Sequence, residues 1–588
     1  MKKTLTLIVI LLIACLVSIF VSACDGSGEG EIFPPATYEI NSEEDFRAIR
    51  EKTGIKYSLA TFLLKTDLDL SSSNWDGIGA SPNVSDAFTG IFDGDGHSIT
   101  YTTQIDPPTE TVLDINERQS FGLFTYANNA TFKNLNIFVN LKTPCEAENI
   151  YVGGLCAYLS GDSSIEDVNV TGNIETTIRD LRQDIVLSDG SIVKPAMGGQ
   201  ENNKYYDLCL GGVVGYSKGD LSYSNVMSSV DINIGRNKYC ILNNLNVGGI
   251  AGIIRPVDIS YNNSSPRINL TNLTFEGSIL AYGGNVYSGG IAGLINHSNV
   301  SNVFVGNSTP SDFSGNAYGR LSFGLVSGVM ENSHLEKARV IADTVFAGSI
   351  STSKKVSFNL GGVAGMLKNS VISLCISDIS FELRNGTYFY AGGIAGVCYD
   401  SDIVGAVSEG GISIVSSGQT VLNIRDYDFK YNMVAIDLAD YSRNAKNGGI
   451  VGRVEGQCQI ADLSSEFQSY QPLFGETANR LEIVILKKGD TFLDEWIEES
   501  GYDRNLMIIT ETFSKDAAED EQQYTINHFY EVEDNLKLTF REINAKVCID
   551  RAEWQLAGRN LENGELGKAQ VDLTAHDALK LSIETEID

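Results

Sequence analysis

One short stretch carries alternating carboxylates, a residue type that binds calcium. Asp93-Gly-Asp-Gly-His97 begins like an EF-hand loop, in which alternating oxygens ligate the ion. The twelfth position holds a bidentate glutamate in such loops, but here it is Gln104, a neutral amide. We therefore predict a structural turn in which Gly94 and Gly96 supply positive φ angles, and no metal site.

A second stretch, Gly215-Tyr-Ser-Lys-Gly219, matches the G-x-S-x-G pattern of a serine nucleophile. That pattern works on a sharp turn between a strand and a helix, and an acid and a histidine must follow it. Here Gly215 is also the last glycine of a repeated motif, so Ser217 is predicted to lie on a turn of the repeat. We interpret the match as coincidence.

The remaining histidines and cysteines form no recognisable metal-binding pattern. The five histidines are dispersed, and the sequence contains no H-x-x-x-H, H-E-x-x-H or C-x-x-C. Paired histidines at such spacing, or paired thiolates, are what zinc sites use. We predict neither a metal nor a cofactor. Eight cysteines follow residue 24, and we expect most to be buried small hydrophobes, with one or two disulfides.

The charge of the chain excludes one class of partner. The 588 residues include 43 Lys and Arg against 75 Asp and Glu, a net charge of −32. Nucleic acids are bound by basic surfaces, so nucleic-acid binding is not expected. The 58 glycines with only 11 prolines, together with 25 Tyr and 25 Phe, indicate a folded chain rather than a disordered linker.

The N-terminus is predicted to direct export and membrane attachment. Lys2 and Lys3 precede an uncharged run that ends in Val21-Ser-Ala-Cys24. This arrangement resembles the lipobox of bacterial lipoproteins, which implies a signal peptide over 1–23, lipidation of Cys24 and a tether over 24–37. The lipid would anchor the protein at the bacterial cell surface. An uncleaved membrane anchor is the alternative, because about 20 apolar residues can span a bilayer.

A glycine motif recurs through the middle of the chain. It begins at Phe121-Gly-Leu and continues in forms such as Val247-Gly-Gly-Ile-Ala-Gly252. The glycine before the aliphatic residue stands at positions 122, 154, 212, 249, 290, 324, 362, 393 and 449. In all copies but the one at 249, an apolar residue follows 12 to 14 positions later: Leu135, Val168, Val226, Val303, Ala338, Leu374, Val407 and Leu463.

Units of this kind predict an all-β solenoid. Short strands between polar turns cannot bury an inner face alone, and stacked copies form a continuous core. The unit length suits three short strands per coil of a parallel β-helix, and a β-propeller is the competing fold. We expect the apolar residues that follow each marker glycine, from Leu135 to Leu463, to form one inward row. Two intervals between successive marker glycines, 154 to 212 and 393 to 449, are longer than the others. We assign them, and the missing spacing after 249, to insertions, chiefly at 176–206 and 416–446.

The glycine motif resembles the GLUG motif of bacterial surface proteins. The preceding segment, with Leu64-Lys-Thr-Asp-Leu-Asp-Leu70 and Phe88-Thr-Gly-Ile-Phe-Asp-Gly94, resembles the first coil of pectate-lyase-like right-handed parallel β-helices. The resemblance implies a β-helix over 38–480, capped by a short helix near residues 41–50. Residues 481–588, with 25 acidic and 11 basic residues, are predicted to form a C-terminal α+β cap or small module.

The resemblance leaves the function open. Polysaccharide-cleaving β-helices are the enzymatic alternative, but adjacent aspartates and Gly-His-Gly, which mark the polygalacturonase groove, are absent from the sequence. We expect a surface adhesin or ligand-binding scaffold without catalysis, and a purely structural envelope protein is a third reading. The partner would be an extracellular glycan or a host or matrix protein. The candidate ligand-binding residues lie on the second insertion: Arg425, Tyr427, Phe429, Tyr431 and Tyr441.

Overall fold

The fold was obtained as a computed structural model of the chain. The structure describes residues 32–105, 112–113, 116–144, 147–177, 185–187, 192–193, 206–235, 242–257, 266–306, 313–349, 357–384, 388–416, 419–423, 445–448, 451–455, 460–465, 480–486, 506–515, 522–533, 537–538, 548–549, 552–553 and 578–581.

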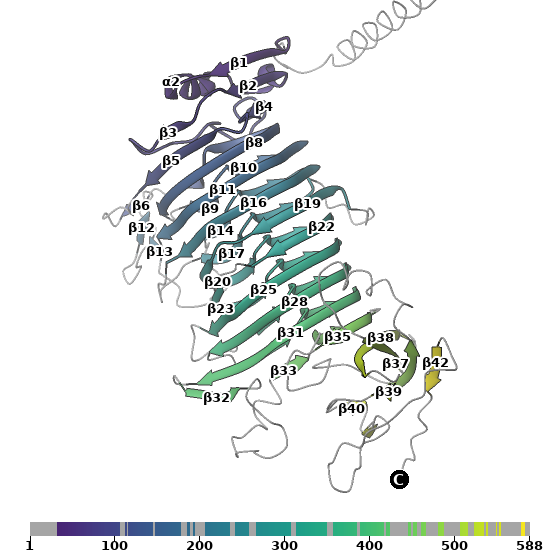
Figure 1. Cartoon of the computed structure of the whole chain (residues 1–588). Coiled ribbons are helices and arrows are strands. Elements are labelled where there is room, and N and C mark those ends of the chain that lie inside the picture. Colours follow the sequence, from purple (N-terminus) through teal and green to yellow (C-terminus); the bar gives the residue numbers. More distant parts are fainter. Residues whose placement is uncertain are drawn as a thin grey trace, which may run out of the picture.

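The chain is a parallel β-helix, as predicted, in which each coil contributes strands to three stacks (Figure 1). The first stack precedes the glycine pair and contains β7 (Asn116–Phe121), β9 (Ala147–Gly153), β14 (Tyr206–Gly211), β17 (Leu242–Gly248), β20 (Ile279–Gly289), β23 (Phe313–Gly324), β26 (Ser357–Gly361), β29 (Tyr388–Gly392) and β33 (Ala445–Gly448).

The second stack follows the glycine pair. It contains the start of β8 (Phe124–Pro144), then β10 (Cys156–Ser160), β15 (Val214–Lys218), β18 (Ala251–Arg255), β21 (Ala292–Asn296), β24 (Ser327–Glu331), β27 (Ala364–Lys368), β30 (Ala395–Tyr399) and β34 (Val451–Glu455).

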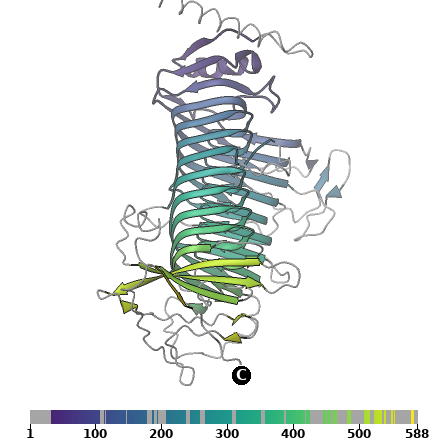
Figure 2. The same cartoon turned by 90° about the vertical axis from the view of Figure 1, so that its right-hand side faces the viewer.

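The third stack completes each coil. It contains the rest of β8, then β11 (Ser163–Thr177), β16 (Leu221–Ile234), β19 (Ile268–Phe275), β22 (Ser298–Val305), β25 (His334–Ser349), β28 (Val371–Arg384), β31 (Asp402–Ser416) and β35 (Ile460–Ser465). Figure 2, seen from the side, shows these coils stacked along one axis.

The glycine pair is required by the inward packing of the third stack. A Cβ added at Gly212 would lie 2.4 Å from Oγ of Ser228, and one at Gly249 would lie 2.2 Å from the ring of Phe275. Ser228 and Phe275 pair in register on neighbouring strands of the third stack. The turn between the first two stacks therefore presses against the third, and only glycine leaves enough space.

The predicted inward row exists, with two corrections. In register, it consists of Leu135, Val168, Val226, Leu273, Val303, Ala338, Cys375 and Ala406, and the backbone of Leu463 pairs with Ala406 at the next position. The copy at 249 supplies Leu273, 24 residues after its glycine (273 minus 249), so an insertion does account for its missing spacing. The prediction was wrong for Leu374 and Val407, because Cys375 and Ala406 occupy their places.

A bend beside the inward row explains the error at Leu374. The residue before the row has a positive φ in successive coils: Asn134, Asp167, Asn225, Asn272, Asn302, Lys337, Leu374 and Gly405. Asparagine tolerates this left-handed conformation, and its amide links the coils, as where Nδ2 of Asn272 donates to Oδ1 of Asn225 at 2.8 Å. Leu374 is an aliphatic residue at this bend (φ 54°), so its hydrophobicity misled the assignment.

The N-terminal end is closed by strands and a short helix. β1 (Ala36–Ile40), β2 (Ala60–Leu64) and β4 (Phe88–Asp93) pair in sequence, as do β3 (Leu68–Leu70) and β5 (Ser98–Gln104). The helix α2 (Glu43–Arg47) continues into the 3-10 turn η1 (Ala48–Glu51), and η2 (Ile55–Tyr57) follows. Phe46 of α2 is fully buried and contacts the rings of Trp75, Phe92 and Phe124. The helix thus covers the open end of the core, as predicted.

The insertions and the C-terminal region contribute short strands. Within the first insertion, β12 (Ile185–Leu187) pairs with β13 (Ile192–Val193) and with β6 (Val112–Leu113) of an earlier coil. In the second, β32 (Gln419–Asn423) is antiparallel to the end of β31. The C-terminal strands are β36 (Arg480–Leu486), β37 (Leu506–Lys515), β38 (Gln522–Glu533), β39 (Lys537–Leu538), β40 (Cys548–Ile549), β41 (Ala552–Glu553) and β42 (Ala578–Leu581).

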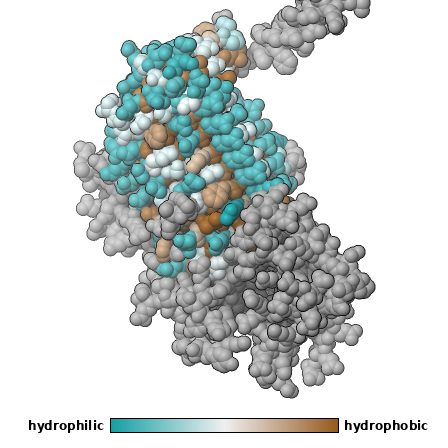
Figure 3. All heavy atoms as spheres, in the orientation of Figure 1, coloured by the Kyte–Doolittle hydropathy of each residue, from teal (hydrophilic) through white to brown (hydrophobic). Residues whose placement is uncertain are grey.

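These C-terminal strands pair differently from those of the coils. β37 is antiparallel to both β36 and β38, and β36 is antiparallel to β42. The helix expected near residues 492–499 lies outside the described residues. Along the side of the solenoid, Figure 3 shows a largely hydrophilic surface through which a band of hydrophobic residues runs.

Candidate binding surface

The residues predicted for lipidation and ligand binding cannot be placed. Cys24 lies outside the described residues, and so do the five candidates on the second insertion, Arg425, Tyr427, Phe429, Tyr431 and Tyr441. These assignments stay predictions.

The Asp93-Gly-Asp-Gly-His97 stretch is a turn, as predicted, but the prediction was wrong for Gly94, because the positive φ angles fall on Asp95 (50°) and Gly96 (83°). Oδ1 of Asp93 accepts hydrogen bonds from the backbone N–H of Asp95 (3.0 Å) and from Nδ2 of Asn134 (3.0 Å). Lys133 pairs with the same carboxylate at 3.1 Å. Burial raises the pKa of Asp93, but these hydrogen bonds and the charge of Lys133 outweigh it and hold the pKa below its usual value. The carboxylate is thus engaged in cross-coil contacts.

Ser217 has no access to a substrate. It is completely buried in β15, and its hydroxyl hydrogen-bonds the phenolic oxygen of Tyr223, which is also fully buried. This confirms that the G-x-S-x-G match is coincidental, although Ser217 lies within a strand and not on the turn that we predicted.

Four cysteines with described side chains are buried and form no disulfide: Cys156, Cys209, Cys375 and Cys398. Burial raises the pKa of the Cys375 thiol to about 12. This thiol therefore stays protonated and unreactive at neutral pH. The expected disulfides do not involve these four residues.

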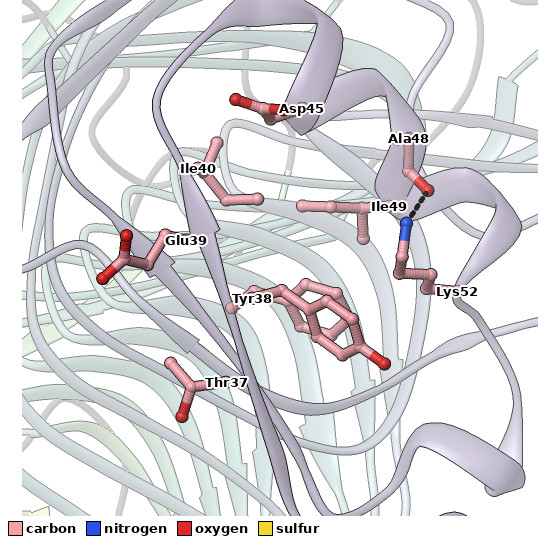
Figure 4. Close-up of a pocket in the computed structure, with 9 residues that line it drawn as sticks. Thr37, Tyr38, Glu39, Ile40, Asp45, Ala48, Ile49 and Lys52 are labelled. Atoms are coloured by element: carbon pink, nitrogen blue, oxygen red, sulfur yellow. Dashed lines mark hydrogen bonds between the residues drawn. The ribbon is translucent and has the colours of Figure 1, made fainter.

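A cavity of about 480 Å³ lies at the N-terminal end, between β1 and α2 (Figure 4). Two of its charged side chains, Asp45 and Lys52, make hydrogen bonds at the ends of the helical segment. Asp45 accepts hydrogen bonds from the backbone of Asn41 and the hydroxyl of Ser42, and Nζ of Lys52 donates to the Ala48 carbonyl at 3.4 Å. Its aromatic wall is Tyr38, stacked on Phe62. We interpret this cavity as the end of the core and not as a ligand site.

A second cluster, formed across coils, combines aromatic and basic side chains. We call it the tyrosine corner: Tyr126, Tyr158 and Tyr216 of the second stack, Tyr151 of the first stack, and Arg118, Lys218 and Arg255. Tyr151 stands between Ile150 and Val152, which are fully buried in the core, so its side chain points outward. Tyr158 and Tyr151 are half-buried, whereas Tyr126 and Tyr216 are 8% and 7% exposed.

The four rings of the tyrosine corner contact one another. Tyr158 and Tyr216 pair in register and stack with centroids 5.0 Å apart. Tyr151 meets these two rings at 5.2 and 5.3 Å, and Tyr126 lies 6.0 Å from Tyr158. The two stacks come close here because glycine separates them: a Cβ at Gly215 would lie 2.7 Å from the backbone nitrogen of Val152.

Arg255 and Arg118 lie near these rings, and none of the three basic residues pairs with an acid within the described part of the chain. The guanidinium of Arg255 lies 5.3 Å from the centroid of Tyr216, and its Nε is buried without a hydrogen-bond partner. Lys218 pairs in register with Arg255, so two positive charges occupy neighbouring strands, which are about 4.8 Å apart. Arg118 is exposed on β7. Within the described residues, no carboxylate forms an ion pair with Arg118, Lys218 or Arg255.

The electrostatics of the tyrosine corner reflect both burial and positive charge. Burial raises the pKa of Tyr151 to about 12, and Arg118 partly opposes this shift. Burial also raises the pKa of Tyr158, against the charges of Arg118 and Arg255. Asp207 is a carboxylate near the corner, and it accepts hydrogen bonds from the backbone N–H (3.2 Å) and Nδ2 (3.0 Å) of Asn244. The corner is therefore a positively charged aromatic surface on an acidic protein.

The sequence analysis missed the tyrosine corner, although a signal was present. Three successive copies of the repeat carry tyrosine at one position, in Phe124-Thr-Tyr126, Cys156-Ala-Tyr158 and Val214-Gly-Tyr216. This position is apolar in the next five copies and is Arg453 in the last one. Alignment of the copies would have shown the row, but not the approach of Tyr151, Arg118 and Arg255 from other strands.

The described residues indicate no metal centre or membrane span. No group of three or more His, Cys, Asp or Glu side chains among them could hold a metal ion. None of the helices in the described part of the chain is long and apolar enough to cross a membrane.

Comparison with known proteins supports the repeat. Residues 148–175, which include β10 and most of β11, match the family described as Glug, the GLUG motif. No curated protein and no solved structure matches the chain. The GLUG resemblance is thus confirmed for one copy of the repeat, and that copy contains two residues of the tyrosine corner, Tyr151 and Tyr158.

Proposed function

We propose that the protein is an exported, lipid-anchored surface protein whose β-helix is a rigid, non-catalytic scaffold for ligand binding or adhesion. The observation that carries the proposal is the tyrosine corner, where aromatic rings lie beside cations that form no ion pair among the described residues, on a stacked backbone. Nine strands of the first stack at about 4.8 Å spacing extend about 40 Å, which is enough to hold a binding surface away from a membrane.

The rigidity of the scaffold favours binding. Side chains on a stacked strand are held in place by the coils above and below, so little conformational entropy is lost when a ligand binds. Tyrosine adds contact area with few rotatable bonds, and tyrosine and arginine are enriched among the residues that dominate binding energy.

The anchor is tested through Cys24. Replacing Cys24 with Ala should release the exported protein from the membrane fraction, because the thiol is the attachment point of the lipid. The measurement is membrane partition of the wild-type and variant chains. Unchanged retention of a cleaved Cys24→Ala form would refute lipid anchoring.

The binding role is tested with an array of glycans and matrix proteins, together with a turnover assay on acidic polysaccharides. We expect binding without cleavage. Cleavage of a polysaccharide would establish the enzymatic alternative, and absence of any binding would leave the structural envelope role.

A chain lacking residues 416–446 tests whether the second insertion contributes to binding. If the predicted loop site carries binding, this deletion abolishes the signal while thermal stability is preserved.

A further inference from the structure

We propose that the tyrosine corner binds an anionic saccharide, a sugar chain that carries carboxylate or sulfate groups. This inference rests on the proposed binding function and names the chemical class of the ligand and its place on the solenoid.

The first argument is the pairing of like charges. Lys218 and Arg255 stand on adjacent strands in register, an arrangement that destabilises a sheet unless something compensates. Elsewhere on the same stack, Lys368 has an acidic partner: its Nζ pairs with Glu331 at 2.6 Å. Acidic residues outnumber basic ones by 75 to 43, so an uncompensated cation pair is unusual here. A bound anion would remove the repulsion.

The second argument is the geometry of the donors. Nε of Arg255 is buried without a partner, so the guanidinium is only partly satisfied in the free protein. Arginine binds carboxylate and sulfate-like oxygens through parallel hydrogen bonds. Lys218 adds charge from the neighbouring strand, and Arg118 adds charge from β7 of the first stack. These three cations can contact successive acidic groups along a chain.

The third argument is the aromatic surface beside the cations. Tyr151 and Tyr158 are half-buried, so part of each side chain remains open to solvent. The C–H face of a sugar packs against such rings, and its hydroxyl groups exchange hydrogen bonds with tyrosine. A saccharide with acidic groups uses both the rings and the cations, which favours it over an acidic protein segment.

The experiment measures binding of acidic oligosaccharides to the full exported chain by calorimetry. The probes are an oligogalacturonate, its methyl ester as the uncharged counterpart with the same rings, a chondroitin sulfate oligosaccharide and inorganic sulfate. The main variant is Lys218→Gln with Arg255→Gln, and the matched control is Lys368→Gln on the same stack. A second variant, Tyr158→Leu, removes a ring without altering charge.

We expect the wild-type chain and Lys368→Gln to bind the oligogalacturonate, the sulfated oligosaccharide or both, and to bind the ester at least about tenfold more weakly. The double variant should lose at least about tenfold in affinity, equivalent to about 1.4 kcal/mol. Tyr158→Leu should weaken binding of the acidic oligosaccharide as well. Affinity should fall with added salt, since the interaction is partly electrostatic.

Stability separates a binding role from a structural one. Removing the like-charge pair should leave the unfolding midpoint of the double variant unchanged or raise it, so lost affinity would not reflect unfolding. The inference is overturned if the ester binds as well as the acid, if only inorganic sulfate binds, or if the double variant retains full affinity. Binding of an acidic protein alone on the array would also overturn it.

These outcomes distinguish the inference from the proposed function. If the array detects a ligand whose binding depends on residues 416–446 and not on the tyrosine corner, the scaffold function stands and the inference fails. If neither the array nor calorimetry detects any ligand, the proposed function itself fails.

Discussion

The second stack has the same inner face along its length but two different outer faces. At its N-terminal half, the outward position holds Tyr126, Tyr158 and Tyr216. In register with these, the next five strands carry Ile253, Leu294, Val329, Met366 and Val397, and the last strand, β34, carries Arg453. The coil geometry is continuous across this change. Stacking therefore constrains the inward residues and the glycines, while the outer row is free to acquire a binding surface in one region only.

A charge placed on the inner face should have the largest effect, and an equal one in both regions. Val226→Asp and Val303→Asp each put an unpaired carboxylate into the core, where the side chains are 0% and 3% exposed. We expect each to lower the free energy of unfolding by more than about 3 kcal/mol. Ser222→Asp, on the exposed side of the same strand as Val226, is the control. Denaturant unfolding measures all three, and tolerance of either core variant would contradict a continuous core.

A methyl group at the glycine turn should have the next largest effect. In Gly249→Ala, the added Cβ would lie 2.2 Å from the Phe275 ring and from the carbonyl of Gly290. We expect a loss of about 2–3 kcal/mol, because the backbone on both sides must shift. Gly235→Ala is the matched control, since its nearest neighbour would be the Thr176 carbonyl at 3.3 Å. Similar melting temperatures for both variants would show that the turn is not tightly packed.

Truncation on the outer face should distinguish the two halves of the second stack. Tyr158 contacts three other rings, so Tyr158→Ala should cost about 2 kcal/mol. Met366 occupies the corresponding position in the aliphatic half and is half-buried, and Met366→Ala should cost about 1 kcal/mol. Denaturant midpoints provide the comparison. A larger loss of stability in Met366→Ala would contradict the expectation that outer-face contacts contribute more to stability in the tyrosine half.

The smallest expected effect is the contribution of Tyr151 to stability at alkaline pH, which does not change near neutral pH. Burial raises the pKa of Tyr151 to about 12 in the folded state, whereas an exposed tyrosine ionises near 10. Because the folded pKa is raised, the neutral phenol contributes stability that is complete below pH 10. That contribution declines as the pH rises from 10 towards 12.

Titration of tyrosinate absorbance against pH would follow this ionisation. The Tyr151→Phe variant should lose one late-titrating group and part of the alkaline decline in stability. An unchanged titration curve would show that Tyr151 is open to solvent in the folded protein.

Much of the fold follows from local patterns. The glycine spacing predicted the coils, and apolar positions such as Leu135, Val168 and Val226 predicted the inward row. Both predictions succeeded because a buried strand face requires apolar residues at the same positions in each copy. The prediction failed at Leu374, where an aliphatic residue occupies the left-handed bend in place of asparagine. Hydrophobicity alone does not report which residue takes that conformation.

The binding surface was less accessible to sequence reasoning than the coils. The insertion at 416–446 was predicted to bind a ligand because its tyrosines are close together in the chain. The tyrosine corner, in contrast, is assembled from residues spread between 118 and 255. Residues such as Tyr151 and Tyr216 meet only because coils stack in register. No local sequence pattern indicates that these residues are neighbours in the folded protein.

The sequence by itself determined that this protein is a β-repeat with three strands per coil, since repeat length, glycine pairs and apolar alternation act within each unit. Only the tertiary structure decided which residues share a row and which side chains meet on the surface. Register is set by hydrogen bonds between coils, and a shift by one residue moves a side chain to the other face. The pairing of Lys218 with Arg255 beside Tyr216 is therefore a property of the stack and not of any single repeat.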